Sequence, residues 1–234
     1  MRAAWYEKQG PASEVLQLGN LPTPEPEQGE VRVKLSFSGV NPSDTKRRLG
    51  FGGQKMAYPA IVPHSDGSGV IDQVGTGVPK NRIGERVWIY CGQWERAHGT
   101  AADYISIRGN HAIHIPDNIE LMSGACLGIP AVTAHRALFS DGPIKGLTVL
   151  VTGGAGAVGN YAIQLAKWGG AERVITTCSS PEKENQAKAA GADLVINYKE
   201  ENVSTKIMDA TDGQGVDRIV EVAFGANLPS TVAL

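Results

Sequence analysis

Residues 147–159, with the sequence LTVLVTGGAGAVG, constrain the fold of this chain more than any other segment. Aliphatic and β-branched residues over 148–152 predict a buried strand, which runs directly into a G-x-G-x-x-G motif at 154–159. Apolar residues then recur at i, i+3, i+4 and i+7 from Val158, which predicts an amphipathic helix. A strand, a glycine-rich turn and a helix in this order are typical of a dinucleotide-binding βαβ unit.

Each glycine of the motif has a distinct role in this interpretation. Gly154 allows a tight turn, Gly156 allows the backbone to approach a pyrophosphate, and Gly159 allows the helix to pack closely on the strand. The N–H groups at the start of the helix would bind the phosphates. A strand–turn–helix without any ligand is the alternative, and we favour the dinucleotide because both flanking elements are present.

The composition is that of an ordinary globular protein. The 234 residues suffice for two domains, and the formal net charge of −2 gives no electrostatic reason to expect a nucleic-acid or membrane partner. No apolar run has the length of a signal peptide or a transmembrane helix. Cys91, Cys126 and Cys178 are far apart and odd in number, which predicts reduced thiols and a cytoplasmic location.

Two kinds of pattern divide the chain between residues 122 and 123. Residues 1–122 contain short alternating strands between Gly- and Pro-rich turns, which predicts a β-barrel-like domain. Residues 123–234 alternate between strands and helices, which predicts β-α-β units on a parallel sheet. We expect strands at 148–152, 173–178, 193–196 and 216–222, and helices at 123–127, 132–139, 158–168, 182–189, 202–210 and 227–234.

The alternation provides about four strands. A six-stranded dinucleotide-binding sheet needs two more, and the last strand would otherwise form an exposed edge. We therefore expect the chain to be a fragment of a longer protein that is poorly active on its own. A natural four-stranded domain is the alternative.

The residues after the second strand of the alternating part bear on the choice of cofactor. NAD-binding sites usually place an acidic residue about 20 residues beyond the glycine motif, whereas this chain has Ser-Ser-Pro at 179–181. A carboxylate there would repel the 2′-phosphate of NADP, so its absence, with Lys183 in the next turn, favours NADPH. Glu182 and Glu184 flank this lysine, and on charge alone a solvated helix lysine is an equally good interpretation.

Several further segments resemble one enzyme family. They are residues 39–44 (GVNPSD), 69–71 (GVI), 84–87 (GERV), 128–134 (GIPAVTA), 191–193 (GAD) and 197–198 (NY), together with the glycine motif. Over its whole length the chain resembles the zinc-free, zeta-crystallin-like quinone oxidoreductases of the medium-chain dehydrogenase/reductase superfamily. The resemblance implies an α/β protein with a co-chaperonin-like β-barrel domain, followed by a Rossmann domain that is incomplete here, with the cofactor between them. We expect the full-length protein to be a homo-oligomer.

The resemblance also implies which residues hold NADPH. The pyrophosphate would lie at the motif residues Gly154, Ala155, Gly156, Ala157, Val158 and Gly159. Ser179, Lys183 and Tyr198 would surround the 2′-phosphate and ribose of the adenosine. Asn227 would approach the adenine, and the Thr133 hydroxyl would point at the nicotinamide.

The same resemblance implies that Asn41 and Asp44 line the floor of the substrate site, although the residues alone would be read as a turn. Lys46 stands where a tyrosine that reaches the cofactor is usual, and we count it with these two as a candidate catalytic residue. Either Lys46 takes over a phosphate contact or the site differs. His64 stands where glycine is usual, a difference that bears on the substrate range.

The sequence predicts a protein without a metal site. Zinc alcohol dehydrogenases of the same fold need Cys and His where this chain has Asn41 and Ser65, and three scattered cysteines cannot form a four-cysteine site. His111 and His114, three apart in a strand-like stretch, would face opposite sides of the sheet. Without zinc an alkoxide lacks its Lewis acid, so alcohol oxidation is not expected.

The predicted function is NADPH-dependent reduction of quinones by hydride transfer to a small-molecule acceptor. A quinone accepts hydride readily, so orientation and proximity become the main tasks of the enzyme. Reduction of the activated C=C bond of enones or enals is one alternative, since it uses the same cofactor geometry. A non-catalytic NADPH-binding protein is another.

Overall fold

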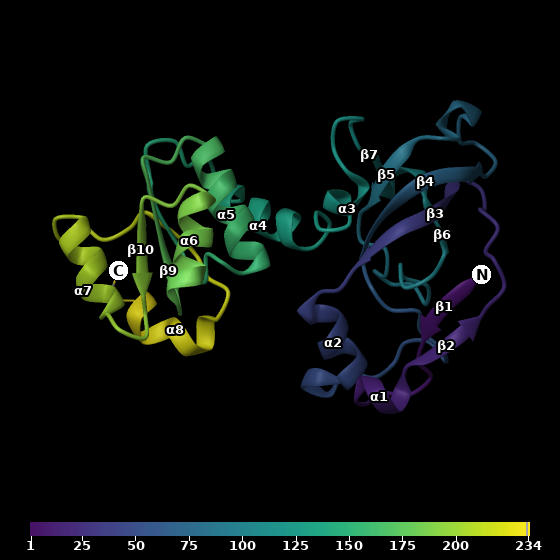
Figure 1. The fold of residues 1–234 in the computed structure, drawn as a ribbon, viewed down its shortest axis with the longest axis horizontal. Coiled ribbons are helices and arrows are strands. Elements are labelled where there is room, and N and C mark those ends of the chain that lie inside the picture. Colours follow the sequence, from purple (N-terminus) through teal and green to yellow (C-terminus); the bar gives the residue numbers. More distant parts are fainter. Residues whose placement is uncertain (233) are drawn as a thin grey trace. The chain divides into compact units, whose positions relative to one another are not determined.

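The computed structural model describes residues 1–232 and 234, which divide into two compact units, Met1–Ile129 and Pro130–Leu234 (Figure 1). This division falls later in the chain than the predicted boundary between residues 122 and 123. No helix in the described part of the chain is long and apolar enough to cross a bilayer.

Unit 1 is built mainly from antiparallel strands. β1 (Arg2–Trp5) pairs with β2 (Gln17–Asn20), and a separate five-stranded sheet has the order β6-β3-β4-β5-β7. Its strands are β3 (Glu30–Gly39), β4 (Asp66–Val74), β5 (Arg86–Ile89), β6 (Tyr104–Arg108) and β7 (Ala112–His114). The helices are α1 (Ala12–Val15), α2 (Pro42–Leu49) and α3 (Leu121–Gly124), with short 3-10 helices at Phe51–Gly53, Lys80–Arg82 and Gly109–His111.

The core of unit 1 follows from the alternation of β3. The register opposes Val31 to Ile107 and Val33 to Ile105, and all four side chains are fully buried. Burying one such side chain contributes about 1.5–3 kcal/mol. The intervening polar residues of β3 face away from this core, so the register is fixed by the pattern.

Unit 2 is a four-stranded parallel sheet with the order β10-β9-β8-β11. Its strands are β8 (Thr148–Val151), β9 (Arg173–Cys178), β10 (Leu194–Asn197) and β11 (Arg218–Val220). Its helices are α4 (Pro130–Phe139), α5 (Ala157–Trp168), α6 (Pro181–Ala189), α7 (Val203–Ala210) and α8 (Phe224–Thr231). Because β8 pairs with both β9 and β11, the strand order reverses at β8, which is where such sheets bind ligands.

Both faces of this sheet are covered, as its continuous apolar strands require. Val149 and Val151 pack with Ala162 and Ile163 of α5 on one face. Leu150, between the two valines, points to the opposite face, where it belongs to a second cluster with the buried residues Ile175, Ile196 and Ile207. The run of apolar residues in β8 therefore marks a strand that is buried on both sides.

Helix boundaries are where the sequence predictions err. The helix expected over 123–127 is instead α3 (Leu121–Gly124), and the helix expected from Val132 begins at Pro130. A proline fits the first turn of a helix because its missing N–H would lack a partner there anyway. The last helix runs over Phe224–Thr231 rather than 227–234, and β11 is shorter than the predicted 216–222.

Candidate functional site

The glycine turn connects β8 to α5, and two of its glycines are required by close packing. A Cβ atom at Gly154 would lie 2.2 Å from Thr176 Oγ1, and one at Gly159 would lie 2.3 Å from the Gly153 carbonyl oxygen. The left-handed backbone of the turn belongs to Gly153, with φ of 66°, one residue before the motif. A Cβ atom at Gly156 would meet only the Gly153 carbonyl oxygen, at 3.2 Å.

The turn presents the N-terminus of a three-turn helix. α5 begins at Ala157, with Gly156 as its N-cap residue. The first N–H groups of a helix have no acceptor within it, so those of Ala157, Val158 and Gly159 can bind an anion. Gly156 and Ala157 are exposed in this turn, and Ala155 is half-buried. The geometry suits a pyrophosphate at the positions that the motif predicts.

A cavity of about 810 Å³ lies at the carboxyl ends of the strands of unit 2. Its lining includes Gly153 after β8, Thr177 of β9, Tyr198 after β10 and Asn227 of α8. The Asn227 side-chain nitrogen donates to both carboxylate oxygens of Glu221, at 3.0 and 3.2 Å. Tyr198 and Asn227, predicted from different segments, therefore line one cavity beside the glycine turn.

Ser179 and Lys183 meet at the end of β9. Lys183 Nζ donates to Ser179 Oγ at 2.9 Å, and Ser180 caps α6 by accepting from the Lys183 N–H. Glu184, one of the flanking glutamates, forms an ion pair with Lys188 at 2.6 Å, one turn further along. The Lys183 ammonium is exposed on the same edge of the sheet as the cavity.

Thr133, the residue predicted to face the nicotinamide, lies in the first turn of α4 and is exposed. Ala134 and Leu138 of the same helix are buried in the core. The Thr133 hydroxyl is thus on the side of α4 that is turned away from the core of unit 2.

In unit 1, the start of α2 carries a buried polar cluster. Asn41 is the N-cap of α2, and its N–H donates to Asp44 Oδ2 at 2.8 Å. Its side-chain nitrogen donates to Asp66 Oδ2 at 2.9 Å. Asn41 is 7% exposed, Asp44 5% and Asp66 1%. The structure brings the two predicted residues together and adds a third, Asp66.

Asp66 is a residue of this cluster that the sequence did not predict. Its carboxylate also accepts the backbone N–H of Ile129, at 2.8 and 3.1 Å for the two oxygens. The signal was an acidic residue directly before the small and apolar residues of 67–71, within a strand that is buried for most of its length. A buried ionised side chain needs hydrogen-bond donors around it, so an acidic residue at this position in the sequence indicates a buried polar cluster.

Burial shifts the ionisation of this cluster. Loss of solvent raises the pKa of Asp66, against hydrogen bonds from Asn41 and Ile129 that lower it. Burial likewise raises the pKa of Asp44, opposed by the Asn41 N–H and the charge of Arg47. Burial lowers the pKa of His64, which keeps its imidazole neutral.

His64 has an unusual backbone for its residue type. Its φ is 77°, a conformation that favours the glycine usual at this position. Its Nδ1 lies 2.9 Å from Ser38 Oγ, which lies 2.9 Å from Thr100 Oγ1. Thr100 donates to the Asp66 carbonyl oxygen at 2.5 Å. A chain of hydroxyl groups therefore links His64 to the backbone of Asp66.

Lys46 is placed apart from the buried cluster. It lies on the exposed side of α2, with its ammonium 5.4 Å from the centroid of the Phe51 ring. This is a cation–π distance. Arg47, the next residue, donates to the carbonyl and side-chain oxygens of Gln93 at 3.2 and 2.5 Å.

The described residues contain no group of three or more His, Cys, Asp or Glu side chains placed to hold a metal ion. Cys91 is half-buried, Cys126 exposed and Cys178 buried, and all three are free thiols. Zinc independence stays a prediction.

Known families match both units. Residues 27–117 match the alcohol dehydrogenase GroES-like domain, and residues 157–234 match the zinc-binding dehydrogenase family. The quinone oxidoreductase of Rattus norvegicus is 35% identical over 231 residues, which cover 98% of this chain and 68% of the relative. The NADPH-dependent alkenal/one oxidoreductase of Arabidopsis thaliana is 34% identical over 209 residues, covering 86% of this chain and 53% of the relative.

Solved structures of related proteins superpose on most of this chain. An NAD-dependent alcohol dehydrogenase superposes with a TM-score of 0.89 and 32% identity, covering 100% of this chain and 74% of that one. A mycobacterial protein in complex with NADPH superposes with a TM-score of 0.80 and 31% identity, covering 94% of this chain and 66% of that one. The α/β fold class predicted from the sequence is confirmed by these likenesses.

Proposed function

This chain belongs to the quinone oxidoreductases of the medium-chain dehydrogenase/reductase superfamily, and from that membership we propose that it binds NADPH and reduces quinones by hydride transfer. The observation that carries the proposal is the pair of Lys183 and Ser179 at the end of β9, 2.9 Å apart. An ammonium and a hydroxyl stand there in place of the carboxylate that NAD-binding sites use. They suit the 2′-phosphate that distinguishes NADPH from NADH.

The residues of unit 2 fit this cofactor. The N–H groups at the start of α5 would hold the pyrophosphate, over a turn in which Gly156 is exposed and carries no side chain. Tyr198 and Asn227 would hold the adenosine in the cavity of about 810 Å³. When bound, NADPH supplies the hydride at its nicotinamide.

The residues of unit 1 fit the acceptor. Asn41 and Asp44 occupy the start of α2, where we place the floor of the substrate site. Hydride transfer to a quinone needs orientation and proximity more than acid–base groups, because the ring delocalises the resulting charge. Asn41 and Ser65 stand where zinc dehydrogenases place metal ligands, so we propose a reduction that needs no zinc.

Reduction of enones or alkenals is the second candidate, favoured by the likeness to the Arabidopsis thaliana enzyme. It would use the same cofactor residues and differ only in the acceptor. A non-catalytic NADPH-binding protein would keep the cofactor site and reduce neither acceptor. A cytoplasmic location and a homo-oligomeric full-length protein stay predictions.

The test measures binding and turnover separately. NADPH and NADH are titrated into the purified full-length protein by nucleotide fluorescence, and steady-state rates are then measured for a panel of quinones and a matched panel of enones. We expect tighter binding of NADPH than of NADH, and higher kcat/KM for quinones. Preferred binding of NADH would contradict the cofactor assignment. Higher kcat/KM for enones would indicate an enone or alkenal reductase. Tight NADPH binding without turnover of either acceptor would indicate a non-catalytic NADPH-binding protein.

A further inference from the structure

Asp66 joins two segments that are far apart in the sequence. Its carboxylate accepts the side-chain N–H of Asn41, 25 residues earlier, and the backbone N–H of Ile129, 63 residues later. Ile129 is the last residue of unit 1, and α4 starts at the next residue. One buried carboxylate thus holds both the start of α2 and the point where the chain leaves unit 1.

The surroundings leave room for this side chain and little else. A Cβ atom at Gly128 would lie 2.3 Å from Asp66 Oδ1, and one at Gly39 would lie 3.0 Å from Asp66 Cβ. The bond from Thr100 fixes the Asp66 backbone as well. Both the side chain and the backbone of Asp66 are therefore held in place.

The carboxylate also decides how the Asn41 amide is oriented. An ionised carboxylate accepts hydrogen bonds and cannot donate them, so Asn41 must turn its nitrogen toward Asp66. The amide oxygen of Asn41 then faces away from Asp66, toward the start of α2, where it accepts the backbone N–H of Asp44 in a capping box. If Asp66 were an amide, either orientation of Asn41 would be possible.

Building on the proposed function, we propose that Asp66 is a positioning residue for the reduction: it orients the Asn41 amide, which holds the start of α2 at the floor of the substrate site, and it holds the Ile129 N–H. It touches neither substrate nor cofactor in this role. The clamp and the orientation are two consequences of the same carboxylate, so one substitution tests both.

The first test is the Asp66→Asn variant. The new amide keeps the shape of the side chain, but its nitrogen opposes the nitrogen of Asn41 or the N–H of Ile129. We expect kcat/KM for quinones to fall roughly 10- to 100-fold, the loss typical of a hydrogen bond to a charged group. We also expect faster hydrogen exchange of the Ile129 amide, which a purely catalytic loss would not change.

The double variant Asn41→Asp with Asp66→Asn tests the orientation directly. The carboxylate and the amide then exchange places, so residue 41 again presents an oxygen to the Asp44 N–H while residue 66 supplies the donor. We expect it to recover at least about half of the logarithmic loss in kcat/KM. If the single variant does not fold, the double variant carries the test, because it keeps a donor–acceptor pair at the same two positions.

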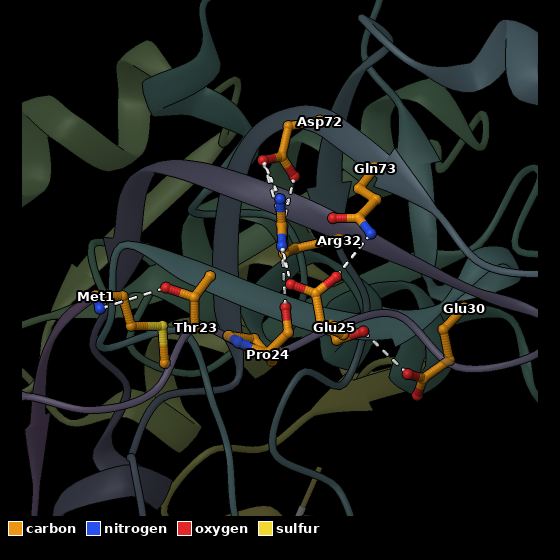
Figure 2. Close-up of polar contacts among 9 residues, drawn as sticks. Met1, Thr23, Pro24, Glu25, Glu30, Arg32, Asp72 and Gln73 are labelled. Atoms are coloured by element: carbon orange, nitrogen blue, oxygen red, sulfur yellow. Dashed lines mark hydrogen bonds and ion pairs between the residues drawn. The ribbon is translucent and has the colours of Figure 1, made fainter.

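Asp72→Asn is the matched control, since Asp72 lies on the same strand. Figure 2 shows its carboxylate beside the Arg32 guanidinium. The carboxylate accepts from Arg32 Nε and Nη2, both at 3.0 Å. We expect unchanged kcat/KM and unchanged exchange at Ile129. Wild-type turnover and exchange in Asp66→Asn, or a folded double variant without recovery, would overturn the proposal. Absence of quinone turnover in the wild type would instead count against the proposed function, because exchange at Ile129 needs no acceptor.

Discussion

Lys183 is the residue on which the choice of cofactor depends most. A charge-assisted hydrogen bond to a phosphate contributes about 1.5–3 kcal/mol, and exposure keeps this one near the lower value. Replacing Lys183 with Ala should therefore raise the KM for NADPH about tenfold and leave the KM for NADH almost unchanged. High salt should reduce the difference, because it screens an exposed ion pair.

Lys188→Ala is the control for this experiment, because Lys188 lies on the same helix and pairs with Glu184. It should change neither KM. An equal loss for both nucleotides in Lys183→Ala would mean that the lysine only supports the fold. No change for either would assign the preference to Ser179, Tyr198 or Lys46.

Asp66 should also leave a signature in the pH dependence of stability. Burial raises its pKa in the folded protein, so between the unfolded value of about 3.9 and the raised value the folded state binds more protons. Stability then falls as pH rises through this window, and the fall ends above the raised pKa. The charge of the nearby Asp44 raises the pKa of Asp66 in the same direction.

Urea unfolding of wild type and Asp66→Asn across this window isolates the contribution of Asp66. The free energy of unfolding of the wild type, minus that of the variant, should decrease from about pH 4 upward and then level off. Asp103, Asp193 and Glu201 have lowered pKa values, so their contribution is lost at lower pH and cancels in the difference. Parallel curves would show that the pKa of Asp66 is the same in both states.

The sequence predicts contacts between individual site residues only where those residues are close together in the chain. Ser179 and Lys183 are only four residues apart, on either side of the start of α6, so their meeting could be expected from their short separation in the chain. The contacts of Asp66 span 25 and 63 residues, and no spacing rule links such positions. Asn41 and Asp44 came from a family resemblance, since a turn explains both from the residues alone.

Among the elements, the turn between β8 and α5 combines two different needs for glycine. Gly159 is needed for packing, because a Cβ atom there would lie 2.3 Å from the Gly153 carbonyl oxygen. A Cβ atom at Gly156 would lie 3.2 Å from that oxygen, a milder contact that a small shift relieves, and we expect the pyrophosphate on this side. We therefore expect a side chain at Gly159 mainly to lower the stability of the protein, and a side chain at Gly156 mainly to weaken cofactor binding.

Alanine substitutions at both positions test this separation. Gly156→Ala should weaken NADPH binding with a stability loss of about 0.5–1 kcal/mol, because alanine is a poorer N-cap residue than glycine. Gly159→Ala should lower the free energy of unfolding by about 1–3 kcal/mol through overpacking, and weaken binding as a consequence. Thermal unfolding and NADPH titration are measured on both variants. A Gly156→Ala variant with wild-type affinity would place the pyrophosphate elsewhere.

Elements were predictable where a periodic pattern and a flanking signal agree. β8, the glycine turn and α5 have both, and their observed bounds differ from the prediction by about one residue. The segment before Pro130 has no such agreement. There Ser68 donates to the carbonyl of Leu121, the first residue of α3, and Asp66 holds the N–H of Ile129, the residue before α4, so tertiary contacts fix the start of both helices.

For the whole molecule, the two units were predictable because their patterns differ in kind. The antiparallel sheet of unit 1 has one buried face and alternates, whereas the parallel strands of unit 2 are buried on both faces and do not. The matching family descriptions cover segments of both units. What each unit binds depends on a few individual side chains. The pattern of apolar and polar residues along the strands predicts the fold of each unit but not the ligand of these side chains.

The matched family of unit 2 is described as zinc-binding, so the metal requirement of the whole protein is a sharp test. Asn41 and Ser65, both buried, stand where zinc dehydrogenases use Cys and His, and neither side chain is a strong zinc ligand. Protein dialysed against a chelator should therefore keep its full quinone turnover with NADPH, and elemental analysis should find no stoichiometric zinc. Asn41→Cys with Ser65→His supplies the positive control, because it restores two ligands of the usual kinds and should increase zinc uptake. Loss of turnover on chelation that added zinc restores, together with one tightly held zinc per wild-type chain, would contradict the metal-free mechanism.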